Sequence, residues 1–232
     1  MSTTVGETGA DYLAVNAGFG KGATSIAMAV LLLTSLLMQL RSKSYTPWLY
    51  WLTVILVSVV GTQITDLLTD KLGVSLYVST AVFAAVLAVI FAGWYRIEGT
   101  LSILSIDTRP RELWYWTAIL CTFALGTAAG DLATEALGLG FQLGTLVFAL
   151  LIGLIAAART FGANAVLAFW LAYILTRPLG AALGDWLSQA KTYGGFGLGP
   201  MLTSVIFLSV IAVLVGVSQR SASRAAVSGL RK

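Results

Sequence analysis

The sequence predicts an all-α fold: a polytopic transmembrane helix bundle of four parallel helical-hairpin repeats, with about eight spans. Three observations lead to this prediction, namely a composition poor in charge, apolar runs long enough to cross a bilayer, and a motif that recurs four times. Of the 232 residues, 58% are hydrophobic and 10% are charged, whereas a soluble domain has roughly 25% charged residues. We therefore expect residues 1–232 to form a single membrane domain whose main partner is the lipid bilayer.

The composition also argues against several classes of function. The chain contains no histidine and one cysteine, Cys121, which lies in an apolar run. Histidine-based catalysis, transition-metal sites and disulfides therefore lack the residues they need. No basic tract is interleaved with aromatic residues, as nucleic-acid binding requires. We expect no enzymatic activity, no cofactor and no nucleic-acid partner, while a homo-oligomer stays open.

Apolar runs of about 20 residues, the length that crosses a hydrocarbon core of about 30 Å, predict the spans in chain order. The first run is short, because Met1 precedes Asp11 by far fewer residues than Trp48 precedes Asp66. The first helix thus lacks about half its length, and we expect that the true start lies upstream or that the chain is truncated. Residues 96–112 form the longest connection. The spans are 1–14 (incomplete), 22–40, 47–69, 74–95, 112–134, 141–158, 164–187 and 200–218.

A Gly-x-x-x-x-Asp pattern recurs four times in register and defines the repeat. Each repeat contains two spans, so successive repeats enter the membrane in the same direction and are parallel. All four aspartates are therefore expected at the same depth and on the same side. The pairs are Gly6 with Asp11, Gly61 with Asp66, Gly126 with Asp131, and Gly180 with Asp185. The repeats are approximately 1–46, 47–111, 112–163 and 164–218, followed by a cytoplasmic tail, 219–232.

Basic residues predict the orientation of the bundle. Most lie in the connections between repeats and in the C-terminal tail, and few lie at the hairpin tips. Cytoplasmic loops carry the excess of Lys and Arg, so we expect a multi-pass protein of the bacterial cytoplasmic (inner) membrane with a cytoplasmic C-terminus. The aromatic clusters Trp48–Trp51 and Trp114–Trp116 fit interfacial anchors on the same side. The first group of basic residues is Arg41, Lys43, Arg96, Arg109, Arg111, Arg159, Arg220, Arg224, Arg231 and Lys232, and the second is Lys21, Lys71 and Lys191.

The four aspartates are the main candidates for function. An ionisable residue within a span costs roughly 2.5–3.5 kcal/mol on insertion scales and often marks a pathway or a paired site. Oxygen ligands without histidine suit hard cations such as Mg²⁺, Ca²⁺, Mn²⁺ or Na⁺, or a proton. We expect a transporter or channel-like permease for a small hard cation or proton. Its cation-binding or metal-binding acidic ring would be Asp11, Asp66, Asp131 and Asp185, with Glu7 added because it shares a helix face with Asp11.

A structural role for the same aspartates is the alternative. Each carboxylate could bond backbone or hydroxyl groups of the following hairpin turn and so fix the repeat. The protein would then be a structural or partner-binding membrane protein. The residues alone leave both interpretations open.

The glycines and one arginine have separate expected roles. We expect Gly6, Gly61, Gly126 and Gly180 to permit close helix packing, as small residues do in membrane bundles. Arg177, which precedes a proline inside a span, could be the counter-ion of an aspartate from another repeat, or a gate.

Several stretches resemble a bacterial family of integral membrane proteins built from four tandem two-span repeats of unknown function. They are Gly6–Thr8 followed by Asp11, Glu98–Ser102, and Thr176–Gly180 leading to Asp185–Leu187. The resemblance covers nearly the whole chain. It implies an eight-helix membrane protein and carries no established activity.

Overall fold

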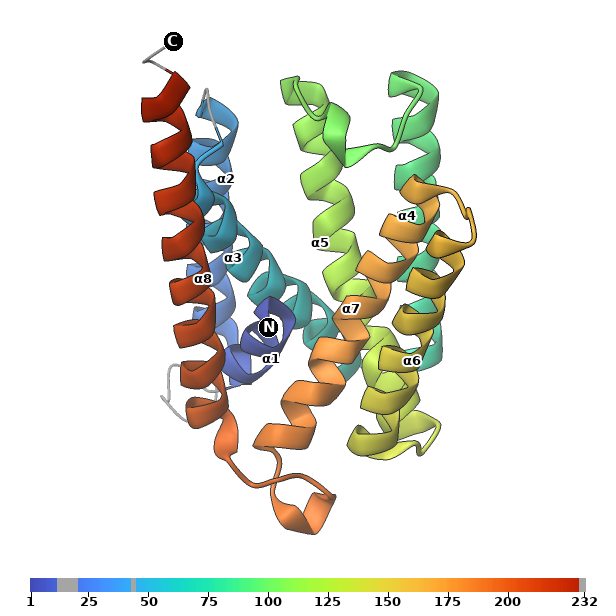
Figure 1. Ribbon diagram of the computed structural model, residues 1–232. Coiled ribbons are helices and arrows are strands. Elements are labelled where there is room, and N and C mark those ends of the chain that lie inside the picture. Colours follow the sequence, from blue (N-terminus) through green and yellow to red (C-terminus); the bar gives the residue numbers. More distant parts are fainter. Residues whose placement is uncertain (12–20, 43–44, 230–232) are drawn as a thin grey trace.

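The structure is a computed structural model that describes residues 1–11, 21–42 and 45–229. The side chains of Glu7, Ala10, Asp11, Lys21 and residues 221–229 lie outside what it describes. The described residues form eight α-helices and no strand (Figure 1). The helices are α1 Ser2–Asp11, α2 Lys21–Arg41, α3 Pro47–Asp66, α4 Leu76–Glu98, α5 Arg109–Asp131, α6 Gly140–Thr160, α7 Ala165–Ser188 and α8 Gly199–Gly229.

The predicted all-α bundle is confirmed, and seven described helices, α2 to α8, are long and apolar enough to cross a membrane. The chain is thus consistent with a multi-pass membrane protein. The connection predicted over 96–112 is shorter than expected, because α4 extends to Glu98 and α5 begins at Arg109. It also folds back onto the bundle: the Trp170 indole Nε1 donates to the Leu101 carbonyl at 2.8 Å, and Arg111 Nε lies 2.7 Å from a Glu98 carboxylate oxygen.

Local sequence signals explain where several helices begin and end. Proline stands in the first turn of both α3 and α5, where a missing N–H costs nothing. The Asn164 side chain caps α7 by accepting from the backbone N–H groups of Val166 and Leu167, at 3.0 and 3.1 Å. Helix α4 ends at Gly99, whose φ of +70° favours glycine.

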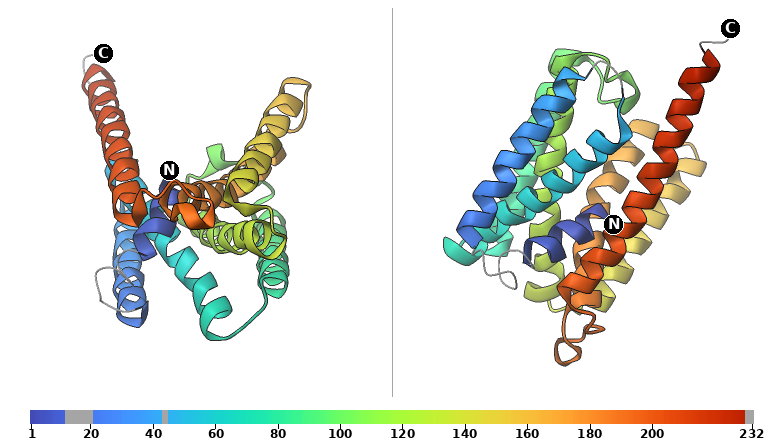
Figure 2. Two further views of the ribbon diagram at one scale, coloured as in Figure 1. Left: turned by 90° about the horizontal axis from the view of Figure 1, so that it is seen from below. Right: turned by 90° about the vertical axis from the view of Figure 1, so that its left-hand side faces the viewer.

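The odd-numbered helices form a closed inner ring in the order α1, α3, α5, α7, with α7 packing back onto α1. Figure 2 shows this ring at the centre, with α2 and α8 on one side and α4 and α6 on the other. We call the end at which α3, α5 and α7 finish the Asp end, and the end at which α3 and α5 begin the Tyr end. Both names refer to side chains described below.

Each crossing in the inner ring brings a repeat glycine against the next odd helix. Every partner lies three residues before the glycine of its own repeat, so the four crossings are equivalent. A Cβ added to any of these glycines would come within 3.0 Å of a side-chain atom of the partner. The pairs are Gly6 with Ser58, Gly61 with Phe123, Gly126 with Arg177, and Gly180 with Thr3.

The even-numbered helices cover the ring, and each packs mainly along the odd helix that follows it. Helix α2 lies on α3, α4 on α5, and α6 on α7, while α8 completes the cycle on α1. The two long helices of one sequence repeat therefore diverge from their short connection. The compact two-helix unit is the second helix of one repeat with the first helix of the next.

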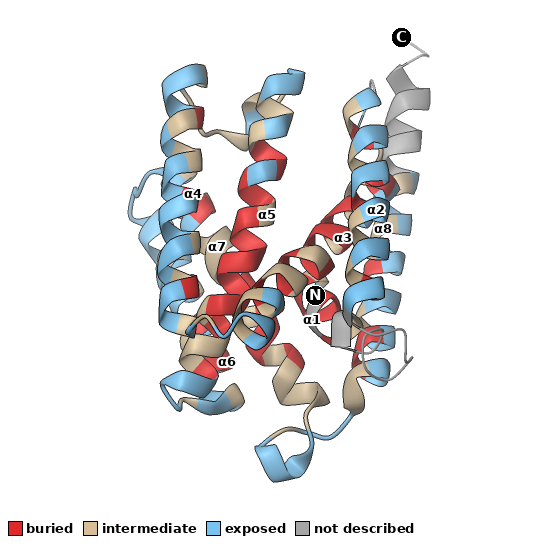
Figure 3. Ribbon diagram, turned by 180° about the vertical axis from the view of Figure 1, so that it is seen from behind, coloured by how far each residue is buried: buried red, intermediate tan, exposed pale blue. Residues whose placement is uncertain are grey.

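Burial and hydropathy separate the inner from the outer helices. The spans containing α3 and α5 are 50% and 61% buried, whereas those of α4 and α6 are 11% and 17% buried, as Figure 3 shows by colour. The outer spans nevertheless have the higher mean hydropathy, 2.2 against 1.7 and 1.3. Lipid is as apolar as leucine, so outer helices need apolar surfaces, and polar side chains gather inside. The candidate functional groups lie on the inner helices.

Candidate functional site

The aspartates of the second and third repeats stand at equivalent breaks in helix geometry. Directly after Asp66 and Asp131, the chain passes into a five-residue π-helical turn, Leu67–Lys71 and Leu132–Ala136 respectively. In each turn a threonine hydroxyl donates to a backbone carbonyl four residues earlier. Such π-helical turns occur frequently at functional sites. In the fourth repeat, α7 stays α-helical to its end.

Three of the four predicted aspartates line one cavity at the Asp end. This cavity, which we call the acidic cleft, has a volume of about 380 Å³. Two further carboxylates, Asp70 and Glu135, also line it. They lie one helical turn beyond Asp66 and Asp131, and that four-residue spacing was the signal for them in the sequence. The lining residues are Asp66, Asp131, Asp185, Asp70, Glu135, Thr69, Ser75, Gln189, Val74 and Leu76.

The remaining predicted ligands cannot be placed in the cleft. The side chains of Asp11 and Glu7 lie outside the described residues. No group of three or more carboxylates among the described residues is arranged to hold one metal ion directly. At about 30 Å³ per water molecule, the cleft has room for roughly a dozen waters. Within the described residues, the cleft thus offers space for water but no preformed set of direct metal ligands.

The acidic cleft concentrates negative charge. Asp131 interacts electrostatically with four other carboxylates, those of Asp185, Glu135, Asp66 and Asp70. Neither lysine nor arginine occurs among the described residues that line the cleft. Rings of acidic side chains of this kind raise the local concentration of cations.

Arg177 lies in the ring of inner helices, away from the cleft. Its side chain is 4% exposed, and its guanidinium carbon lies 3.7 Å from the centre of the Phe123 ring and 4.2 Å from that of Tyr173. Its Nη1 donates to the Thr3 hydroxyl at 3.2 Å. Eight residues of α7, about 12 Å, separate Arg177 from Asp185. Among the described residues, the Arg177 guanidinium group thus contacts two aromatic rings and the Thr3 hydroxyl group.

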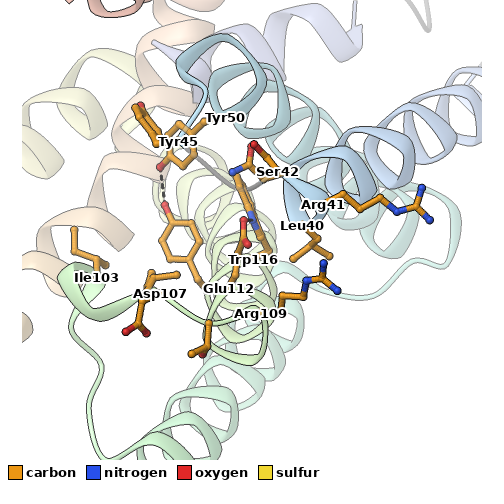
Figure 4. A pocket seen from close by; sticks show the side chains of 14 residues that line it. Leu40, Arg41, Ser42, Tyr45, Tyr50, Ile103, Asp107, Arg109, Glu112 and Trp116 are labelled. Carbon is orange, nitrogen blue, oxygen red and sulfur yellow. Dashed lines mark hydrogen bonds between the residues drawn. The ribbon is translucent and has the colours of Figure 1, made fainter. Parts of the chain in front are cut away.

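A second cavity opens at the Tyr end, and the sequence analysis did not predict it. Its volume is about 740 Å³, and it lies between the last residues of α2, the first residues of α3 and α5, and the 99–108 connection. Tyr50 and Tyr115 line it, and their hydroxyl groups are hydrogen-bonded at 2.6 Å (Figure 4). The Tyr115 side chain is buried, although the aromatic clusters were predicted as interfacial anchors. Both tyrosines occupy the same position of the repeat, and this equivalence was the sequence signal that could have predicted their proximity.

Comparison with known proteins agrees with the repeat architecture. A family model, Repeat of Unknown Function (DUF347), matches residues 1–45, 49–100, 114–163 and 168–223. No curated protein and no solved structure matches the chain. The four matches follow one another along most of the sequence, and the chain therefore belongs to the DUF347 family of repeat proteins.

Proposed function

We propose that this protein is a multi-pass transporter or channel-like permease for a small hard cation or a proton, located in the cytoplasmic membrane of a bacterium. The observation that carries the proposal is the convergence of Asp66, Asp131 and Asp185 on one cavity at the end of the inner helix ring. Three sequence-distant carboxylates at one repeat position attract a cation far more strongly than any one of them alone. The proposal assigns no catalytic residue.

The distribution of basic residues supports an orientation with the Tyr end and the C-terminus in the cytoplasm. Arg41, Arg109 and Arg111 lie at the helix ends that form the Tyr end. Figure 1 has the 99–108 connection and the last residues of α8 at this same end. The acidic cleft then faces the outside and receives cations from there.

Carboxylate-to-amide substitutions test the proposal. The variant Asp11→Asn/Asp66→Asn/Asp131→Asn/Asp185→Asn keeps side-chain volume and removes the charge. Reconstituted into liposomes, it should take up Mn²⁺, Na⁺ and protons no faster than empty liposomes, while the unsubstituted protein takes up at least one of them. Glu98→Gln, at an acid of the Tyr end that lines neither cavity, is the control and should keep full uptake. Unchanged uptake by the folded fourfold variant would refute the proposal.

The structural alternative has its own supporting observation, because equivalent π-helical turns follow Asp66 and Asp131. If stabilising the hairpins is the whole role of the aspartates, single Asp→Asn changes lower the thermal stability in detergent, and no ion protects the protein. A transported ion that binds the folded state at 100 times its Kd should instead stabilise it by about 2.7 kcal/mol. A thermal screen with the same ions therefore separates the two functions.

A further inference from the structure

The inner ring has one layer at which the four repeats carry different side chains. The residue three positions before each repeat glycine packs on the preceding odd helix, and these residues are Thr3, Ser58, Phe123 and Arg177. Backbone geometry is equivalent at the four positions, but only one of them is charged. The fold is therefore symmetric in this layer while the chemistry is not.

Arg177 joins this layer across the ring. It starts on α7, stacks on Phe123 of α5 at 3.7 Å, and donates to Thr3 of α1 at 3.2 Å. It thus contacts two of the three other members of the layer, each on a different helix. With 4% of its side chain exposed, the guanidinium group lies inside the helix ring.

The Arg177 layer separates the two cavities. Along α5, Phe123 lies eight residues, or about 12 Å, after Tyr115 of the Tyr-end cavity and eight residues before Asp131 of the acidic cleft. The Tyr173 phenol interacts with both Tyr115 and Arg177. A polar chain therefore runs from Tyr115, which lines the Tyr-end cavity, through Tyr173 to the guanidinium group. Thr62 and Thr127, whose hydroxyls lie 3.2 Å apart, follow on the side of the cleft.

We propose that Arg177 is the closed gate and the charge-selecting residue of the path between the two cavities, an inference that rests on the proposed function. A cation about 4 Å from a fixed positive charge, at an effective dielectric constant of about 20, is disfavoured about a thousandfold. Arginine side chains exclude cations and protons from other pores in this way. The acidic cleft is thus a blind entrance in this conformation, and a cation passes only when the guanidinium group leaves the layer.

Thiol accessibility tests the gate without depending on transport. In a Cys121→Ala background, which removes the one native thiol, Thr69→Cys places a thiol at a residue that lines the acidic cleft. Impermeant methanethiosulfonate reagents of opposite charge, trimethylammonioethyl and sulfonatoethyl, are applied to vesicles of each orientation. Tyr45→Cys and Leu72→Cys, 61% and 66% exposed at the Tyr end and the Asp end, are the positive controls for the two sides.

We expect the Thr69→Cys thiol to react from the Asp end and to be protected from the Tyr end. Adding Arg177→Gln should accelerate the reaction of this thiol from the Tyr end. The acceleration should be about tenfold or more larger for the cationic reagent than for the anionic one. Arg177→Lys, which keeps the charge, should retain the exclusion, and Arg159→Gln on the exposed end of α6 should change nothing. Equal reaction from both sides with Arg177 intact would overturn the proposal, even if Arg177→Gln fails to fold.

The same vesicles distinguish this proposal from the proposed function. Labelling of Thr69→Cys needs neither ion flux nor the cleft carboxylates. Protection from the Tyr end that persists in a protein without cation uptake would refute the transport function and leave the barrier standing. Uptake that requires the aspartates, together with labelling from both ends, would refute only the gate.

Discussion

The close helix crossings give the sharpest test of the fold, and Gly126→Ala is the most informative change. The added Cβ would overlap the Arg177 Cβ and lie 3.1 Å from both Arg177 Cα and Cγ. The Cα and Cβ atoms cannot rotate away, so helices α5 and α7 must separate by roughly 1.5–2 Å, because carbon atoms rest about 3.5–4.0 Å apart. Overpacking of this kind lowers the free energy of unfolding by about 1–3 kcal/mol. Because the backbone itself must move, we expect a loss of about 3 kcal/mol for Gly126→Ala.

Gly153→Ala is the matched control. Gly153 lies within α6, and a Cβ there would meet nothing within 4 Å. Alanine is favoured over glycine in a helix interior by about 0.5–1 kcal/mol, and this gain applies to both variants. The two free energies of unfolding should therefore differ by about 3 kcal/mol, roughly a hundredfold in the unfolding equilibrium.

Reversible unfolding in mixed micelles, followed by circular dichroism, measures this difference. Gly61→Ala and Gly180→Ala, at equivalent crossings, should destabilise the protein as Gly126→Ala does. Gly216→Ala should leave the free energy of unfolding close to that of Gly153→Ala. If Gly126→Ala were as stable as Gly153→Ala, the inner ring would not have the close α5–α7 crossing described here. The placement of Arg177 inside the ring would then lose its basis.

Three further predictions concern single interactions. Asn164→Ala removes the cap of α7 and should lower the free energy of unfolding by about 1 kcal/mol, whereas Asn164→Asp keeps the accepting oxygen and should retain most of that energy. Chemical unfolding of the two variants measures the difference. Equal losses of stability would contradict the role of the cap. Tyr50→Phe and Tyr115→Phe should each lower the free energy of unfolding by about 1 kcal/mol, because each removes the hydrogen bond that the two hydroxyl groups share. The double variant should lose less than the sum of the two. Strict additivity in this mutant cycle would show that the hydroxyl groups do not interact. Arg111→Gln should loosen the 99–108 connection, because Arg111 binds Glu98 and Asp107. Backbone hydrogen exchange over residues 99–108 should become faster, while the melting temperature stays nearly unchanged. Unaltered protection of these amides would contradict the role of Arg111.

Much of the helix map could be predicted because membrane spans carry a strong length signal. The apolar run 141–158, for example, lies within helix α6, Gly140–Thr160. The four-copy Gly-x-x-x-x-Asp pattern added the relation between helices, which predicts that Asp66, Asp131 and Asp185 share one depth. Their meeting in one cleft follows from that equivalence once the odd helices close into a ring.

The pairing of outer and inner helices could not be predicted from the same signals. Helices α2, α4, α6 and α8 have a high mean hydropathy of 1.9 to 2.5, as expected of helices that face lipid. A few buried hydroxyl groups, such as those of Ser35, Ser79 and Thr203, mark the inward side of an outer helix, but they do not indicate which inner helix it contacts. The surroundings of Arg177 were hidden for a related reason: stacking on Phe123 and Tyr173 depends on the angle at which α5 and α7 cross, and sequence spacing does not contain that angle.

Repetition in this fold separates what holds the bundle together from what gives it a function. The glycines are the same in all four repeats because each performs the same task of letting two helices approach. The residue that follows each glycine is the same in only two repeats, being Glu7, Thr62, Thr127 and Ala181, and the residue three positions before it differs in all four. A uniform ring of four acids alone would attract cations without directing them. A single buried arginine in one repeat makes the two ends of the bundle chemically different. The transport that we propose needs such a difference, because the ion must be held on one side before it is released to the other.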